Sequence, residues 1–274
     1  MPRLLELSRD PGGAVSSRPR PAPWRCMLLL AFALGAILGS FNNVLIHRLP
    51  RGESVVWPGS RCPACGHSLS WWENVPLVSF LLLRGRCRAC RTAISWRYPL
   101  VEAVTAAGVL YAYLRHGLTW EGVASAVLAF LLVPVVFIDL EHRIIPDRIT
   151  LPGIVLGLAL SFARGGLQGL WQAALAGLGA GAFFLAVAVL SKGGMGGGDV
   201  KLAAMLGAFT DPARVFVGTF LGVLVGGLVG LGLLATGRKR RKDAIPFGPF
   251  LAAGGFAGAE WGRQILAWYL GLFT

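Results

Sequence analysis

Long runs of apolar residues, separated by short polar connections, dominate the pattern of this chain. The first run, Met27 to Ile46, has about the 20 residues that a helix needs to cross ~30 Å of hydrocarbon. No small-residue cleavage site follows it, so residues 26–47 predict a retained membrane anchor. Seven further runs bring the expectation to about eight transmembrane helices in an all-α polytopic membrane protein: 99–114, 121–138, 149–163, 168–190, 200–209, 213–236 and 247–270.

Two segments interrupt this apolar pattern. Residues 1–25 contain five prolines and five arginines without any periodicity, which predicts a disordered tail. Residues 48–97 hold eight arginines and four cysteines, and we expect them to form a small domain outside the membrane, between the first and second helices. The remaining residues, 98–274, are expected to form one membrane-embedded domain.

Composition agrees with this interpretation. Hydrophobic residues make up 55% of the chain and charged residues only 14%, whereas an ordinary soluble protein has about 25% charged residues. A soluble enzyme is therefore excluded. The net charge of +13 could indicate a nucleic-acid partner, but Lys and Arg cluster between the apolar runs, as topology signals do. We expect contact with a lipid bilayer and no nucleic acid.

The same charges predict the orientation in the membrane, because cytoplasmic connections hold an excess of Lys and Arg. One alternate set of connections holds 17 of the 26 basic residues: 48–97, 141–148, 191–201 and 237–243. The opposite set holds only Arg115, Arg164 and Arg214. The cysteine-containing domain is therefore expected in the cytoplasm with both termini outside, although the five arginines of the N-terminal tail oppose this orientation.

Four cysteines in two CxxC pairs predict a metal site. Cys62 and Cys65 form the first pair, and Cys87 and Cys90 form the second, 21 residues later. Such a set binds one zinc ion tightly, and a closed four-cysteine site has a structural role because it leaves no position for a reacting water. Two disulfide-linked or buried pairs are the alternative, which the reducing cytoplasm disfavours.

Two carboxylates stand where apolar runs meet polar connections. Asp139 ends one apolar run, and Asp199 follows a glycine-rich stretch. Carboxylates at such positions cost free energy and usually mark function. Two of them close together would share a proton and could act as acid and base. For Asp199 a helix N-cap is the alternative, and for Asp147 a turn and helix start is the favoured interpretation.

Other features leave alternatives open. A transporter could use Asp139 and Asp199 as a proton or cation site, but the cysteines would then have no role. A membrane-anchored binding module would leave the aspartates without one. The glycine-rich stretch lacks the Gly-Lys-Ser/Thr ending of a phosphate-binding loop.

Glycines spaced by four residues predict close helix packing: Gly218, Gly222, Gly226 and Gly230, and Gly254, Gly258 and Gly262.

In combination, several blocks of this sequence resemble the type IV prepilin peptidase family. They occur in order between about residues 35 and 250, and only the proline-rich tail lies outside the pattern. The blocks are Gly39-Ser-Phe-Asn-Asn-Val44 with Arg48-Leu-Pro50, both CxxC pairs, Arg97-Tyr-Pro-Leu-Val-Glu102, Ile138-Asp139 through Pro146-Asp147, Gly196-Gly-Gly-Asp-Val-Lys201, and Ile245-Pro-Phe-Gly-Pro249.

The resemblance implies a bifunctional enzyme of the bacterial cytoplasmic (inner) membrane. Such an enzyme cleaves the leader peptide from type IV pilin or pseudopilin precursors and then methylates the new N-terminus with S-adenosylmethionine. The resemblance assigns the two catalytic aspartates to Asp139 and Asp199. It makes four residues candidates for methyl transfer, since they lie in blocks beside the cysteine domain: Asn43, Arg97, Tyr98 and Glu102. An intramembrane GxGD-type protease without methyltransferase activity is the nearest alternative.

Overall fold

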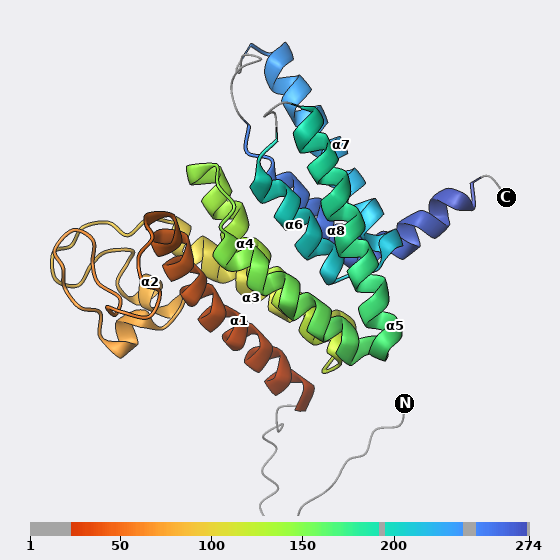
Figure 1. Cartoon of the computed structure of the whole chain (residues 1–274). Helices are drawn as coiled ribbons and strands as arrows, with labels where there is room; N and C mark the ends of the chain where they lie inside the picture. Colours follow the sequence, from red (N-terminus) through yellow and green to blue (C-terminus); the bar gives the residue numbers. More distant parts are fainter. Residues whose placement is uncertain (1–22, 192–194, 238–244, 273–274) are drawn as a thin grey trace, which may run out of the picture.

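The computed structural model describes residues 23–191, 195–237 and 245–272, and these form a bundle of helices (Figure 1). Most of the tail predicted over residues 1–25 lies outside the described residues. The elements are α1 (Pro23–Arg48), the short 3-10 helices η1 (Leu49–Arg51) and η2 (Trp71–Asn74), α2 (Val78–Leu82), α3 (Arg97–His116), α4 (Trp120–His142), α5 (Asp147–Leu190), α6 (Gly197–Ala208), α7 (Pro212–Ala235) and α8 (Gly248–Leu270).

Each apolar run of the sequence is helical, and two of the runs are joined in α5. The backbone leaves the helical conformation at Gly165 and Gly166, between the runs 149–163 and 168–190. Gly166 has φ +59°, a left-handed conformation that glycine adopts without steric cost. Figure 1 shows the two halves of α5 as a V, so this element acts as two helices joined by a sharp bend.

The prediction of about eight transmembrane helices is not supported. Among the described residues, four helical segments are long and apolar enough to cross a membrane: Arg25–Arg51, Trp120–His142, Asp147–Leu190 and Pro212–Ala235. The 12 residues of α6 are too few to span ~30 Å of hydrocarbon. Charged residues lower the hydropathy of the other two long helices, with Glu102 and Arg115 in α3, and Glu260 and Arg263 in α8. The chain is a multi-pass helical membrane protein.

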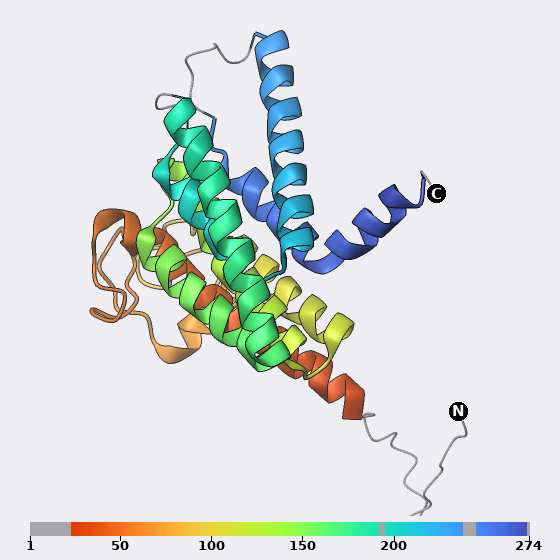
Figure 2. The same ribbon diagram turned by 45° about the vertical axis from the view of Figure 1, so that its right-hand side comes forward.

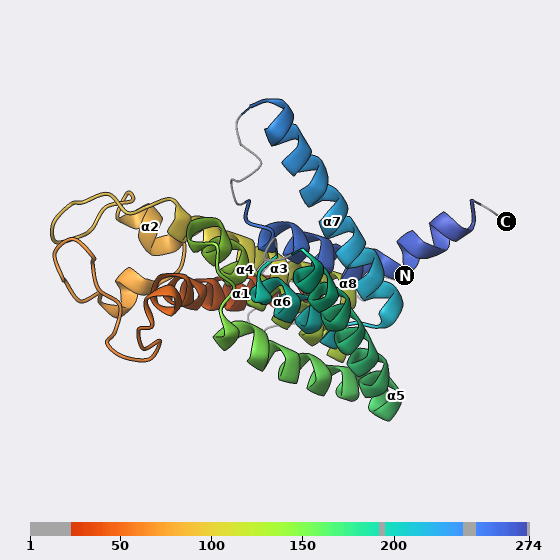
Figure 3. The same cartoon turned by 45° about the horizontal axis from the view of Figure 1, so that its top comes forward.

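The short helix α6 lies in the middle of the bundle. It packs against α5, α7 and α8 (Figure 3). Leu202, Met205 and Leu206 are almost completely buried. Gly207 lets α5 approach, because a Cβ at this position would overlap the backbone of Ala176 and Gly177. A helix too short to span is tolerated at membrane depth when protein rather than lipid surrounds it.

Helices α7 and α8 cross through the glycine faces that the sequence predicts (Figure 2). A Cβ on Gly218 would lie 2.9 Å from the Gly254 carbonyl oxygen and 3.0 Å from the Gly255 Cα. A Cβ on Gly258 would overlap the Gly218 backbone. Contacts this close require glycine on both helices, which confirms the predicted close packing at these positions.

Replacing Gly258 with Ala should therefore destabilise the bundle. The added methyl group forces α8 away from α7, and overpacking of this kind costs about 1–3 kcal/mol. Gly227, also in α7, offers a matched control because a Cβ there would meet nothing within 4 Å. Thermal unfolding of detergent-solubilised protein should give a lower Tm for Gly258→Ala and an unchanged or higher Tm for Gly227→Ala. Equal Tm values for the two variants would contradict the packing argument.

Candidate functional site

Asp139 is a buried carboxylate held by the start of another helix. It lies in the last turn of α4, where its carbonyl oxygen accepts a hydrogen bond from the backbone N–H of Arg143, a residue in the left-handed conformation. Its Oδ2 accepts a hydrogen bond of 2.9 Å from the Gly248 N–H, at the N-terminus of α8. A Cβ on Gly248 would lie only 2.8 Å from that oxygen. Only glycine leaves room for this contact, and the helix N-terminus favours a negative charge there.

Asp199 is half-buried in the first turn of α6. The N-cap position of this helix is Gly196, whose carbonyl oxygen accepts a hydrogen bond from the Asp199 N–H. The alternative of Asp199 as an N-cap is therefore wrong; its carboxylate instead accepts a hydrogen bond from the backbone N–H of the N-cap residue, Gly196. Asp147 is the first residue of α5, following Pro146, so the prediction of a helix start there is confirmed.

The two aspartates converge around one side chain. A Cβ on Gly198 would lie 2.8 Å from Ile145 Cβ, and a Cβ on Gly248 would lie 3.2 Å from Ile145 Cδ1. The starts of α6 and α8 thus pack on the same residue of the α4–α5 connection. Asp139 and Asp199 lie close enough to repel each other electrostatically. Two carboxylates that interact in this way can serve as acid and base.

Two ion pairs flank the aspartates, and each involves a residue two positions after one of them. Arg97 Nη1 donates to both Glu141 oxygens at 2.7 and 2.6 Å, which joins the start of α3 to the end of α4. Lys201 Nζ donates to both Asp147 oxygens at 2.7 and 2.6 Å, which joins the starts of α6 and α5. Sequence reasoning missed both pairs, because partners so far apart along the chain leave no local pattern.

The four cysteines come together as a compact cluster. Their sulfur atoms all lie within 4.8 Å of one another, with 3.9 Å between Cys62 and Cys90 and 4.0 Å between Cys65 and Cys87. Four thiolates at about 2.3 Å from a tetrahedral zinc ion would be about 3.8 Å apart. All four thiols are free, which does not favour the disulfide alternative. The cluster therefore fits a metal ion of the predicted kind.

The same turn occurs twice and builds this cluster. Gly66 N–H donates to the Cys62 carbonyl oxygen at 2.9 Å, and Arg91 N–H donates to the Cys87 carbonyl oxygen at 3.0 Å. Both donors have positive φ, +72° for Gly66 and +62° for Arg91. Each turn is closed by an isolated antiparallel bridge, Arg61 to Ser68 and Arg86 to Ala93. Each CxxC pair thus presents two thiols in the same way to a common centre.

Glu73 holds the segment that follows the first cysteine turn. Its Oε2 accepts hydrogen bonds from the Ser70 N–H at 2.9 Å and the His67 Nε2 at 3.3 Å. The Ser70 amide, more than the His67 ring, lowers the pKa of Glu73 below its ordinary value. Glu73 is therefore a charged, paired group with a structural role.

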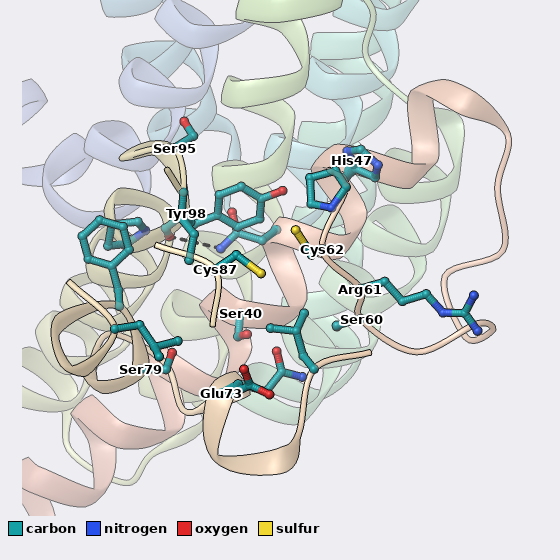
Figure 4. Close-up of a pocket in the computed structure, with 18 of the residues that line it drawn as sticks. Ser40, His47, Ser60, Arg61, Cys62, Glu73, Ser79, Cys87, Ser95 and Tyr98 are labelled. Atoms are coloured by element: carbon teal, nitrogen blue, oxygen red, sulfur yellow. Dashed lines mark hydrogen bonds between the residues drawn. The ribbon is translucent and has the colours of Figure 1, made fainter. Parts of the chain in front are cut away.

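A cavity of about 500 Å³ lies between α1, α3 and the cysteine domain (Figure 4). Asn43 Nδ2 donates to the Tyr98 carbonyl oxygen at 3.1 Å. Asn43 Oδ1 and Arg97 Nε are buried there without a hydrogen-bond partner in the described part of the chain. The wall of the cavity thus contains one acceptor and one donor whose hydrogen-bonding capacity is not used within the described residues. All four methyl-transfer candidates from the sequence line it, together with Ser40, His47 and Arg61, which sequence reasoning did not identify.

Two family models match this chain. Residues 33–116 match the model of the bacterial peptidase A24 N-terminal domain, and residues 126–231 match that of the type IV leader peptidase family. The two matches contain the cysteine cluster and both aspartates, respectively. No solved structure gave a significant match.

Three similar proteins carry the name prepilin leader peptidase/N-methyltransferase. The protein from Pseudomonas aeruginosa is 37% identical over 89% of this chain and 93% of its own length. The protein from Bacillus subtilis is 36% identical over 89% of this chain and 98% of its own length. The protein from Myxococcus xanthus is 46% identical over 76% of this chain, a match that covers 63% of that relative. With this fold, this aspartate pair and these matches, the chain belongs to the type IV leader peptidase family.

Proposed function

We propose that this chain cleaves the leader peptide from type IV prepilin or pseudopilin precursors and then methylates the new N-terminus. The proposal depends above all on the convergence of Asp139 and Asp199 at the end of the bundle that carries the cysteine domain. The names of the similar proteins support both activities. A transporter would need no cavity beside the cysteine cluster, so the peptidase and methyltransferase explain more of the molecule.

In the proposed mechanism, Asp139 and Asp199 are the catalytic residues. One carboxylate is ionised and takes a proton from a water molecule, while the other is protonated and donates a hydrogen bond to the scissile carbonyl oxygen. The water oxygen bonds to the carbonyl carbon, the C–N bond breaks, and the leaving amine takes up a proton. The hydrogen bond from Gly248 holds Asp139 for this reaction.

We infer a location in the bacterial cytoplasmic (inner) membrane, with the cysteine domain in the cytoplasm. The excess of Lys and Arg in the connections on that side supports this orientation. The basic run at residues 238–242 lies outside the described residues. The precursor would enter from the bilayer with its hydrophobic helix and keep its basic leader on the cytoplasmic side.

We assign one structural zinc ion to Cys62, Cys65, Cys87 and Cys90. The separation of their sulfur atoms fits tetrahedral coordination. Zinc in a site with four protein ligands organises the polypeptide and does not activate water. Its role would be to fix the cysteine domain, and with it one wall of the cavity.

We assign the cavity to S-adenosylmethionine, whose bound form supplies a methyl group on a positively charged sulfur. A volume of about 500 Å³ is in the range of small-molecule sites. Glu102 and Arg97 line the cavity, and they would supply an acceptor for the positive groups of this cofactor and donors for its carboxylate. Asn43 Oδ1 is a second acceptor, buried in the wall without a hydrogen-bond partner among the described residues. Tyr98 lines the same cavity and is fixed there through its backbone by Asn43.

Asp139→Asn and Asp199→Asn should each abolish leader cleavage in a folded, membrane-inserted protein. An amide keeps the shape of the carboxylate but cannot act as base or shared-proton acid, and the loss should be about 10²- to 10⁴-fold or more. Asp147→Asn and Glu141→Gln are matched controls that should reduce leader cleavage far less. Mass spectrometry of a precursor incubated with each variant measures the effect. Substantial cleavage by Asp139→Asn, at a protein level equal to wild type, would remove Asp139 from the mechanism.

Cys62→Ser should remove the zinc and loosen the cysteine domain, because a site that loses one of four ligands binds metal much more weakly. Cys26, an exposed cysteine in α1, provides the control, and Cys26→Ser should keep one zinc ion per chain. Metal analysis of the purified proteins is the measurement. Absence of zinc from the wild type, or full zinc content in Cys62→Ser, would refute the assignment.

Asn43→Ala should reduce methylation and spare cleavage. Loss of a hydrogen bond to a charged group costs about 1.5–3 kcal/mol, so methylation of a pre-cleaved peptide should fall about 10- to 100-fold. Asn42 is the matched control, because its Nδ2 donates to Thr105 and Phe130 within the helix packing and not in the cavity. Asn42→Ala should affect both activities together, through stability. An Asn43→Ala protein that methylates at the wild-type rate would exclude this cavity as the methyl-donor site.

A further inference from the structure

Helix α2 leaves an apolar surface uncovered on the cysteine domain. Ser79, Phe80 and Leu83 line the cavity, whereas Val78, Leu81 and Leu82 point away from it and are 49%, 73% and 70% exposed. Residues at spacings of three and four lie on one face of a helix. Trp71, in the neighbouring η2, is 83% exposed. We call Trp71, Val78, Leu81 and Leu82 the α2 surface. An apolar surface of this kind marks an interaction site.

This surface is level with the last turns of α1 and the first turns of α3, and so lies on the membrane side of the helix ends that flank the cysteine domain. The Leu77 N–H, just before α2, donates to Glu102 Oε2 at 2.8 Å. Glu102 lies five residues into α3, which is about 7.5 Å from the start of that helix at Arg97. Ser40, whose side chain interacts with the Glu102 carboxylate, lies eight residues, or about 12 Å, before the end of α1. Figure 1 accordingly shows α2 beside α1 and not beyond its end.

The polar residues around α2 match those of a membrane–water boundary. Arg48 and Arg97, at the ends of α1 and α3, mark where the apolar helices meet the cytoplasmic polar zone. Arg84 and Arg86 follow α2 and are exposed. Trp96 is exposed and packs on Phe80 with 4.9 Å between ring centroids. Tryptophan and arginine are the residues that anchor protein at the surface of an anionic leaflet.

We propose that the α2 surface is inserted in the cytoplasmic leaflet of the membrane and anchors the cysteine domain there. The surface lies several ångströms deeper than the helix ends. This depth is similar to that of amphipathic helices at membrane surfaces, which lie about 5–10 Å into the boundary between headgroups and acyl chains. One wall of the cavity is then held at the membrane surface, where a chain embedded in the bilayer can reach it. The inference depends on α1 as a membrane-spanning helix, with α3 packed against it, and on the cytoplasmic orientation proposed above, but on neither proposed activity.

Photo-crosslinking tests this anchor in full-length protein reconstituted into liposomes that contain radiolabelled phospholipid. Benzoylphenylalanine at position 81 or 82 should give a lipid adduct several-fold more abundant than at two control positions. Leu83 is the control for the helix face, since it lines the cavity. Glu53 is the control for depth, since it is exposed and its N–H donates to the Arg48 carbonyl oxygen at the end of α1.

The outcomes separate lipid from other occupants of the surface. A lipid adduct at positions 81 and 82 that clearly exceeds both controls supports the anchor. Equal lipid labelling at all four positions overturns it, and so does an adduct with the mass of a second protein chain. Only variants whose Tm equals that of the wild type are compared, so that a misfolded protein is not mistaken for an unanchored one. Leader cleavage is not the readout, so failure of the proposed function would leave this test intact.

Discussion

The hydrogen bond from the Gly248 backbone to the Asp139 carboxylate is the contact on which the candidate active site depends. A buried carboxylate is costly unless a donor satisfies it, and the N-terminus of α8 provides both a donor and a favourable dipole. The contact exists because residue 248 has no side chain. It joins the end of α4 to the start of α8, and Ile145 extends the junction to the start of α6. The position of Asp199 therefore depends on the same backbone packing.

Glycine has a similar role deeper in the bundle. The contacts of Gly207 with α5 and of Gly218 and Gly258 between α7 and α8 bring helix backbones together without intervening side chains. In a membrane, where lipid is as apolar as a leucine side chain, such packing replaces the hydrophobic effect as a source of association. It encloses α6, and this allows a helix of 12 residues to carry a half-buried carboxylate at the edge of the membrane domain.

The two candidate sites lie at the same end of the molecule and are linked through Arg97. Its Nη1 pairs with Glu141, near Asp139, while its Nε is buried in the cavity wall beside the cysteine domain, with no hydrogen-bond partner among the described residues. The ion pair between Arg97 and Glu141 thus connects the site proposed for cleavage with the cavity proposed for methyl transfer. The membrane position proposed for α2 fits this arrangement, because a pilin helix that stays in the bilayer would present its new N-terminus near the same surface.

The sequence by itself determined that the chain is a membrane protein and where its helical segments lie. It also identified the two cysteine pairs and the two aspartates as candidate site residues. Hydropathy, CxxC spacing and a carboxylate at the end of an apolar run are local patterns. It overestimated the membrane-spanning helices, since an apolar run does not reveal whether lipid or protein will surround it, as for α6. It placed residues 48–97 outside the membrane, which stays a prediction, and it did not identify the exposed apolar face of α2. Only the tertiary structure decided that Gly248 meets Asp139, that Arg97 pairs with Glu141, and that Asn43 and Glu102 share one cavity. These contacts join residues far apart in the chain, and their geometry arises from how the helices pack.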